Sequence, residues 1–350
     1  MKKSLIALAV LAASGAAMAQ SSVALFGIID AGVGYVNHTN AAGDNKYGLG
    51  TSGNQTSRIG FRGTEDLGGG LKAGFWLEGE VFADNGNVDG LNFKRRSTVG
   101  LEGNFGEVRL GRDLTTGYAK TSSYDLFSQT GIGQFSAWKN WDGAIDQNGD
   151  ANGIRANNTV AYFTPNFGGV KGAVNYSFDE KVNGKAARYV GGNVSYDNGP
   201  LSVAVSYDRL NVVSAARGAG DRDAFTLGAS YNFGVAKLNG VIQQQKYKYD
   251  AGANRKFNNY MLGVSAPVGG AGEVKLQYAR YDQKAIDATA DQLSLGYVHN
   301  LSKRTAVYGT VAYLKNKDGS SLGLAAKGIN TTGVANQSQS GVQVGVRHSF

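Results

Sequence analysis

The chain contains no cysteine, which excludes disulfide staples, thiol catalysis and a cysteine-based metal centre. Beyond residue 20 it has no run of about 18 apolar residues, so the sequence predicts no transmembrane helix. Histidine is scarce as well: His38, His299 and His348 are the only three. They fall near the ends of predicted loops or strands, which leaves no obvious general base for hydrolytic chemistry. Because disulfides are excluded, the stability of the fold must come from backbone hydrogen bonds and from burial.

The first residues differ in character from the rest. Lys2 and Lys3 form a positive region, residues 5–11 are apolar, and Ala17-Met18-Ala19 is a small-residue cleavage pattern. This combination predicts a signal peptide over residues 1–19 and a mature chain over 20–350. The apolar stretch is too short for a membrane anchor, which needs about 20 residues. The chain carries a net charge of +8, but export and the scattered placement of the charges argue against a nucleic-acid partner.

What the sequence does have is alternation of apolar and polar residues with a period of two, recurring from residue 23 to the C-terminus. Gly is abundant at 52, and Tyr supplies 18 of the aromatic residues, as expected for many strands joined by tight turns. The last strand is the clearest case. One face carries Val342, Val344, Val346, His348 and Phe350, and the other carries Gln343, Gly345, Arg347 and Ser349. A soluble sandwich is the alternative, but it needs a larger apolar core than these half-faces supply.

The connections between these segments alternate in length. Short turns are expected at 66–70, 103–106, 165–169, 197–200, 232–234, 267–272 and 300–304, and long loops at 38–54, 83–92, 113–153, 179–188, 211–221, 250–256, 282–290 and 317–337. Fifteen connections join sixteen strands, an even number that lets a barrel close without free edges. The sequence therefore predicts an all-β fold, a 16-stranded antiparallel transmembrane β-barrel in a bacterial outer membrane.

The third long loop, at 113–153, is far longer than an ordinary connection. Its apolar residues are Tyr124, Leu126, Phe127, Ile132, Phe135, Trp138 and Trp141. Such groups are too many to lie in water, so we expect the loop to fold into the lumen, where it would narrow a water-filled pore. An exposed loop on the outer rim is the alternative.

Basic residues are expected on the lumen face. Alternation with the apolar residues of the same strands places Arg58, Arg62 and Arg155 inside. In the run Lys94-Arg95-Arg96 consecutive residues face opposite sides, so at least one arginine must face the lumen. Permanently charged guanidinium groups in a low-dielectric channel concentrate anions and repel cations. The alternative is that these arginines pair with Asp30, Glu78 or Glu80 and merely stiffen the wall.

Two weaker patterns concern other chemistry. Asp146, Asn148, Asp150 and Asn152 alternate like oxygen ligands, but the EF-hand pattern fails at Ala151 and Asn157, so only loosely bound calcium is expected. The run 319–323 spells a nucleophile elbow but lies in a polar loop without the required strand and helix. An outer-membrane barrel enzyme and a surface adhesin or receptor remain alternatives to a channel.

The chain resembles the general porins of β-proteobacteria, most strongly the anion-selective trimeric porins of the comamonad group. The resemblance rests on residues 25–30, Ser57-Arg58-Ile59-Gly60-Phe61-Arg62-Gly63, Gly111-Arg112-Asp113, Tyr124-Asp125-Leu126-Phe127 and the terminal Phe350. It implies a homotrimer with one pore per subunit, a third loop inside the lumen and a constriction lined by arginines that match Arg58, Arg95 and Arg155. Alternation favours Arg96 over Arg95 at the second of these positions; we follow the resemblance for Arg95 and keep Arg96 as the alternative.

Arg62 and Arg96, which alternation favours, Lys94 and the loop carboxylate of Asp125 are the less certain site residues. The expected partners are small anionic solutes, such as inorganic anions and small organic acids, two further copies of the chain, and outer-membrane lipid and lipopolysaccharide. No cofactor and no enzymatic activity are expected.

Overall fold

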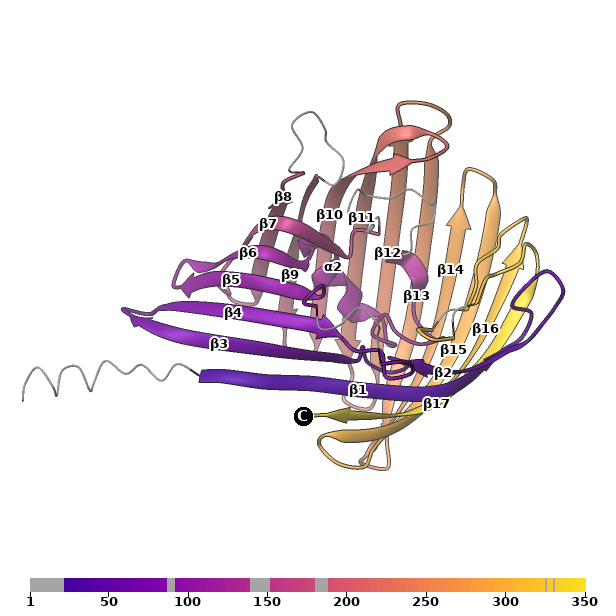
Figure 1. Cartoon of the computed structure of the whole chain (residues 1–350), viewed down its shortest axis with the longest axis horizontal. Helices are drawn as coiled ribbons and strands as arrows, with labels where there is room; N and C mark the ends of the chain where they lie inside the picture. The colour runs from indigo at the N-terminus through magenta and orange to yellow at the C-terminus, as the bar shows by residue number, and fades with distance from the viewer. Residues whose placement is uncertain (1–21, 87–91, 139–151, 180–187, 325, 330) are drawn as a thin grey trace, which may run out of the picture.

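The structure is a computed structural model that describes residues 22–86, 92–138, 152–179, 188–324, 326–329 and 331–350. The described chain forms one antiparallel sheet that closes on itself, since the first strand pairs with the last (Figure 1). Its strands are β1 (Ser22–Val36), β2 (Lys46–Thr51), β3 (Arg58–Gly68), β4 (Leu71–Glu80), β5 (Arg96–Gly103), β6 (Gly106–Leu114), β7 (Arg155–Phe163), β8 (Val170–Ser177), β9 (Tyr189–Asn198), β10 (Leu201–Ser214), β11 (Gly218–Asn232), β12 (Lys237–Tyr249), β13 (Arg255–Val268), β14 (Gly272–Gln283), β15 (Ala288–Asn300), β16 (Thr305–Lys317) and β17 (Ser338–Ser349).

The predicted count of sixteen strands is confirmed, because β2 and β3 are two halves of one interrupted strand. Both pair with β1: β2 with its C-terminal half and β3 with its N-terminal half. The prediction of a loop at 38–54 is therefore wrong in part, since residues 46–51 belong to the barrel wall. Gly residues at alternate positions of β2 hid its pattern from the sequence analysis.

The interruption between β2 and β3 is organised by one buried carboxylate. Asp30 accepts hydrogen bonds from the backbone N–H groups of Gly53, Asn54 and Gln55 at 3.1, 2.9 and 2.7 Å. The Tyr308 hydroxyl donates to the same carboxylate at 2.7 Å. Charge-assisted bonds of this kind satisfy backbone donors that have lost their strand partners. The turn therefore has a fixed conformation, and it ends one residue before β3 begins.

The two faces of the wall follow the alternation that the sequence predicts. On β17, Val342, Val344 and Val346 are half-exposed on the outward face, whereas Gln343 is fully buried on the inward face. Exposed aromatic residues lie near both ends of the strands, such as Tyr231 and Tyr297 at the turn end and Tyr176 and Tyr313 toward the loop end, as expected for the two interfaces of a bilayer. Among the described residues, no helix has the length and apolar character needed to cross a membrane.

The strands at the loop end are longer than the sequence suggested. β10 runs to Ser214 and β11 starts at Gly218, so most of the predicted loop at 211–221 belongs to the ladder. The expected loops at 250–256 and 282–290 shrink in the same way. Beyond the bilayer an outward face need not be apolar, so polar residues continue a strand there without any signal in the alternation.

Candidate functional site: a basic cavity inside the barrel

The long connection after β6 lies against the inner wall. It contains short helical turns that the sequence did not reveal: α2 (Thr116–Ala119), η1 (Thr121–Tyr124) and η2 (Ser136–Trp138). The Thr115 side chain caps α2 by accepting from the N–H of Tyr118 at 3.4 Å. Figure 1 shows α2 within the ring of strands.

Uncharged side chains of the wall hold this loop. Gln277 accepts from the N–H of Leu126 at 3.1 Å, and the Tyr281 hydroxyl accepts from the N–H of Ser136 at 2.9 Å. Gln292 donates to the carbonyl of Ile132 at 3.1 Å. The apolar residues that predicted an inward fold are buried, each at most 8% exposed: Tyr124, Leu126, Phe127, Ile132, Phe135 and Trp138. Trp141 lies outside the described residues.

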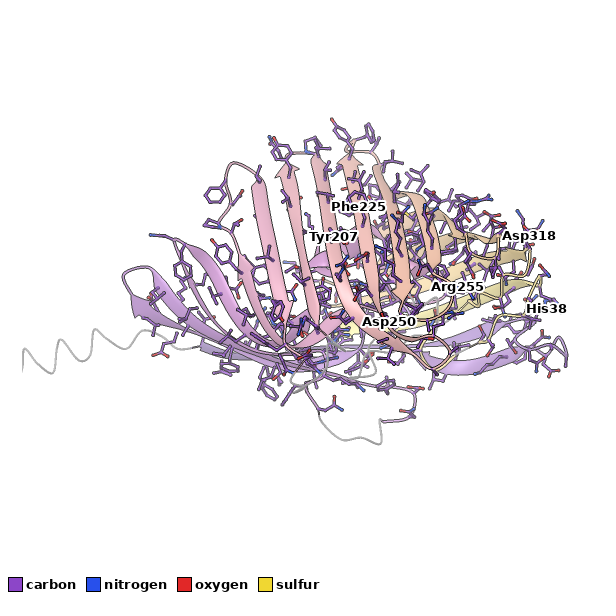
Figure 2. All side chains as sticks on the ribbon, turned by 90° about the horizontal axis from the view of Figure 1, so that it is seen from above. His38, Tyr207, Phe225, Asp250, Arg255 and Asp318 are labelled. Atoms are coloured by element: carbon purple, nitrogen blue, oxygen red, sulfur yellow. The ribbon has the colours of Figure 1, made fainter. Side chains whose placement is uncertain are left out.

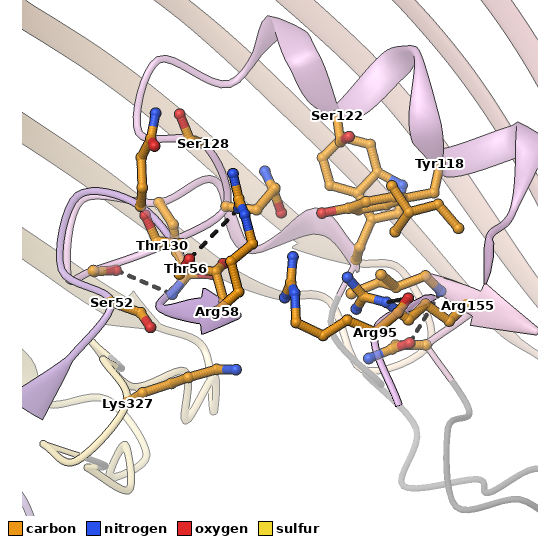
Figure 3. Close-up of a pocket in the computed structure, with 18 of the residues that line it drawn as sticks. Ser52, Thr56, Arg58, Arg95, Tyr118, Ser122, Ser128, Thr130, Arg155 and Lys327 are labelled. Carbon is orange, nitrogen blue, oxygen red and sulfur yellow. Dashed lines mark hydrogen bonds between the residues drawn. The ribbon is translucent and has the colours of Figure 1, made fainter. Parts of the chain in front are cut away.

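Between the loop and the opposite wall remains a cavity of about 660 Å³ (Figure 3). Four cationic side chains line it, and we call this group the basic cluster: Arg58, Arg95, Arg155 and Lys327. Hydroxyl and amide groups line the loop side, among them Ser122, Ser128, Gln129, Thr130 and Gln134.

Arg58 enters the cavity from the first residue of β3, where the Asp30-capped turn ends. Its guanidinium group donates only a long bond, 3.5 Å, to the carbonyl of Thr56. Within the part of the chain that the structure describes, Arg58 forms no ion pair. The sequence interpretation that arginines pair with Asp30 does not hold for Arg58, because that carboxylate is occupied by backbone N–H groups.

Arg95 and Arg155 approach from the neighbouring part of the wall. The Nε of Arg95 forms an ion pair with Glu78 at 2.6 Å, so the pairing interpretation is correct for this residue. The Nε of Arg155 donates to the carbonyl of Arg95 at 2.9 Å. Arg155 begins β7, and the β6–β7 ladder shifts register just after it along β7, between the Asp113–Ala156 pair and the Gly111–Thr159 pair. Alternation alone was therefore not a secure guide to its orientation.

A buried ion pair fixes the chain segment that leads to Arg155. Arg222 on β11 is 1% exposed and pairs with Asp208 on β10. Its Nη1 also donates to the carbonyl of Asn152 at 2.8 Å, three residues before Arg155. A buried charge pair of this kind is costly to break from one side, so this contact holds the end of the long loop in place.

Lys327 is the member of the basic cluster that sequence reasoning missed. It lies in the loop between β16 and β17 and forms an ion pair with Glu80. The Lys327 side chain is still 44% exposed, but partial desolvation in the cavity lowers its pKa; the Glu80 carboxylate opposes this shift, and Arg95 and Arg155 add to it. A signal existed: Leu322, Leu324 and Ile329 are apolar residues in an otherwise polar loop, and they are buried here. The same argument predicted the inward fold of the longer loop.

The less secure site residues are divided between two places. Arg62 and Arg96 line an adjoining cavity of about 350 Å³. The guanidinium carbons of Arg62 and Arg96 lie 5.1 and 4.5 Å from the Trp76 ring centre. Arg95 and Arg96 thus both face the interior at different levels, because β5 begins only at Arg96 and the alternation of that strand does not extend to Arg95. Lys94 lies over the Phe82 ring and does not line either cavity.

Asp125 does not line the basic cavity. It is 4% exposed and accepts hydrogen bonds from the N–H groups of Phe127 and Gln129 at 3.2 and 2.7 Å. Burial raises the pKa of Asp125, and these hydrogen bonds partly offset the rise. Its carboxylate therefore stabilises a turn of the loop instead of facing the solute path.

The possible calcium segment and the run 319–323 form no further site among the described residues. Asp146, Asn148 and Asp150 of the possible calcium site lie outside the described residues, and Asn152 uses its side-chain oxygen to accept from the N–H of Ile154. No group of three metal-ligating side chains occurs within the described ranges. Ser320 of the run 319–323 donates to Asn316 in a loop between two strands.

A closed barrel with an apolar outward face and a polar interior, narrowed by an internal loop, defines a transmembrane diffusion channel. Residues 5–319 match the family model of the Gram-negative porins, and the chain belongs to this family. It is therefore an outer-membrane porin, a passive channel and not an enzyme.

Two named relatives and one solved structure support this family assignment. The chain is 66% identical to outer membrane porin protein 32 of Delftia acidovorans over the whole of both chains. It is 29% identical to major outer membrane protein P.IB of Neisseria meningitidis serogroup B, again over the whole of both. A solved structure described as an anion-selective porin from Comamonas acidovorans superposes with a TM-score of 0.90 and 62% identity, over 95% of this chain and 100% of that one.

Proposed function

We propose that this porin passes small anions in preference to cations, and that the basic cluster sets this preference. The observation that carries the proposal is the balance of charge around the cavity. Four cationic side chains line it, whereas the described acidic partners of the cluster are Glu78 and Glu80. Excess fixed positive charge in a narrow channel raises the local concentration of anions.

Two further features support this proposal. Arginine stays charged at every relevant pH and offers several donors to carboxylate or phosphate. The lining of hydroxyl and amide groups opposite the cluster can hydrogen-bond a hydrated anion without adding charge. The related structure from Comamonas acidovorans is itself described as anion-selective. Inorganic anions and small organic acids are the solutes that fit a polar cavity of this kind.

The sign of the reversal potential tests the proposal. Purified porin is inserted into a planar bilayer with potassium chloride at about tenfold different concentrations on the two sides. We expect a potential of the sign that chloride permeation produces. A potential of the opposite sign would remove the anion preference while leaving the porin assignment intact.

We also propose that the chain works as a homotrimer. Outward apolar residues of β1, such as Leu25 and Val33, are more than half exposed in the single chain. A structure of an outer membrane protein of Vibrio cholerae, 15% identical over 94% of this chain with a TM-score of 0.70, is described as a trimer form. Native mass spectrometry in detergent should give three times the subunit mass. A monomer under conditions that preserve the fold would contradict this.

The removal of residues 1–19 and the weak binding of calcium stay predictions. N-terminal sequencing of protein from the outer membrane should start at Gln20. Calcium should change the trimer's melting temperature if the oxygen-rich segment around Asp150 holds the ion, and an unchanged temperature would argue against that site.

A further inference from the structure

The loop between β16 and β17 returns from the end of the barrel to the inner wall. Figure 2 shows Asp318, the first residue of this loop, and His38, just after β1, at the same end of the barrel. Farther along the loop, Leu324 and Ile329 belong to the buried cluster inside the barrel that also contains Phe135 of the long loop. The loop is therefore packed inside the barrel.

Residues 326–329 of this loop form a tight turn. The N–H of Ile329 donates to the carbonyl of Ala326 at 3.0 Å, and Gly328 has a φ of +82°. A positive φ at the third residue is typical of a type II turn and favours glycine there. Lys327 is the second residue, so it lies at the corner of the turn. Its side chain points toward the arginines of the basic cluster (Figure 3).

Three glycines of the barrel wall lie beneath this turn. Gly34 on β1 directly faces Gly48 on β2, and Gly50 is at the next inward position of β2. Their neighbours Val33 and Leu49 are more than half exposed on the outward face, so the three glycines lie on the inward face. We call Gly34, Gly48 and Gly50 the glycine seat.

The side chain of Ile329 fills the space that larger residues would occupy at the glycine seat. A Cβ atom on Gly34 would overlap the Cδ1 of Ile329. Cβ atoms on Gly48 and Gly50 would lie 3.5 and 3.1 Å from the Cγ1 of the same side chain. Ile329 is fully buried as a result. Any side chain at Gly34 would therefore displace Ile329 from the wall.

The backbone of the turn also lies directly on β2. The N–H of Thr51, the last residue of β2, donates to the carbonyl of Lys327 at 3.1 Å. A Cβ atom on Gly328 would lie 2.7 Å from the Cα of Gly50, so only glycine allows this approach. Because the main chain of Lys327 is fixed here, its ammonium group lies in the adjacent part of the cavity, where it forms the ion pair with Glu80.

We propose that Ile329, packed on the glycine seat, holds Lys327 in the cavity and thereby determines part of the ion selectivity of the pore. The selectivity part of this inference rests on the proposed anion preference, because Lys327 acts on permeating ions through its charge. Ile329 is a positioning residue: it is uncharged, does not line the cavity and acts through Lys327. The packing of Ile329 also gives a physical reason for the alternate glycines of β2.

An exchange of side-chain size across the glycine seat tests the proposal. Gly34→Ala places a methyl group where the Cδ1 of Ile329 lies, so it should displace the turn and lower the ratio of anion to cation permeability, measured by the reversal potential at low salt. The loss should not exceed that of Lys327→Gln, which we expect to be roughly fivefold, since a unit charge about 8 Å from an ion in water changes the local concentrations of anions and cations about twofold in opposite senses.

Ile329→Val removes Cδ1, so the double variant Gly34→Ala/Ile329→Val should recover most of the wild-type selectivity. Unchanged selectivity in Gly34→Ala, or a loss that Ile329→Val does not recover, would overturn the proposal.

Two comparisons separate the positioning of Lys327 from a general disturbance of the wall. In the Lys327→Gln background, Gly34→Ala should cause no further loss of selectivity, and an equal loss there would contradict the inference. Ile329→Ala should lower the selectivity as Gly34→Ala does. The matched control is Ile286→Ala, the same change at a residue that is 52% exposed in the loop between β14 and β15. It should leave the selectivity unchanged, and equal losses in both isoleucine variants would also refute the positioning role.

The mobility of a spin label at position 327 tests the glycine seat independently of selectivity. Because the chain contains no cysteine, Lys327→Cys accepts a single nitroxide label. Its electron paramagnetic resonance spectrum should show a more mobile label after Gly34→Ala and a return toward the original mobility after the further change Ile329→Val. Equal mobility in all three proteins would overturn the proposal. Since this readout does not depend on the sign of the reversal potential, failure of the seat is distinguishable from failure of the proposed anion preference.

Discussion

Neutralising Arg58 is the sharpest test of how the basic cluster works. Arg58 is the member with no ion pair among the described residues, so the change Arg58→Gln removes a positive charge that no described carboxylate contacts, although Glu78 acts on it at longer range. Glutamine keeps the polar character and part of the length of the side chain. The Asp30-capped turn before β3 does not involve the guanidinium group, so the barrel should fold normally.

The size of the effect follows from Coulomb's law. A unit charge about 4 Å from an ion contributes about 1 kcal/mol even when the dielectric constant is that of water. An energy of about 1 kcal/mol corresponds to roughly a fivefold change in local concentration. Anions become scarcer by that factor and cations more abundant by the same factor, so the ratio of anion to cation permeability should fall by roughly 25-fold before screening. Screening reduces this over a Debye length of about 10 Å at 0.1 M salt.

The assay is the reversal potential across a planar bilayer at low salt, where screening is weakest. The control is Lys94→Gln, which removes an equal charge from a residue that does not line the cavity. We expect a smaller loss of anion selectivity for this control, because Lys94 lies over the Phe82 ring beside Lys327 without lining the cavity. Unchanged selectivity in Arg58→Gln, or the same loss in both variants, would refute the reasoning, because the preference would then depend on net charge and not on the cluster.

Two further predictions concern residues around the cavity. Because burial and the neighbouring arginines lower the pKa of Lys327, this side chain should lose its charge below the pH at which an ordinary lysine does. Anion selectivity should therefore decline as the pH rises toward 10.5, and Lys327→Arg should abolish most of that decline; a flat wild-type profile would contradict this. Arg222→Gln leaves the carboxylate of Asp208 buried without its partner, which should cost about 3–5 kcal/mol of stability and lower the melting temperature. Adding Asp208→Asn should recover part of the loss, and failure to recover would show that the pair itself is not the cause.

The strands of the barrel wall could be predicted from the sequence because lipid on one side and water on the other impose an alternation of apolar and polar residues. Lipid outside and water inside require alternate residues to differ, as in residues 342–350, and this requirement holds across the bilayer. The requirement for alternation ends where the bilayer ends. The prediction was therefore wrong about the loop-end strands, such as β10 and β11 around 211–221, where both faces meet water.

Alternation predicted only some members of the basic cluster. Arg58 follows the alternation of β3, so its inward position was correctly expected. Arg95 precedes β5, so the alternation of that strand does not reach it, and the family resemblance indicated it. Alternation placed Arg155 inside, but a register shift separates it from the β7 residues on which that alternation was based. Lys327 lies in a loop, where no alternation exists, and its place depends on contacts between segments far apart in the chain. The ion pair with Glu80 joins positions 247 residues apart.

The acidic partners of the basic cluster allow its electrostatic role to be separated from a structural one. Glu78 and Glu80 pair with Arg95 and Lys327. If these carboxylates only stiffen the wall, Glu78→Gln and Glu80→Gln should lower stability and leave selectivity unchanged. If the field of the cavity decides selectivity, each change releases one unbalanced positive charge and should raise the anion preference, the opposite of the effect of Arg58→Gln. Glu102→Gln, at the adjoining cavity, is the matched control and should have a smaller effect because of its greater distance from the cluster. A decrease in anion preference in both Glu78→Gln and Glu80→Gln would show that the pairs act by positioning Arg95 and Lys327, since the lost geometry would then outweigh the gained charge.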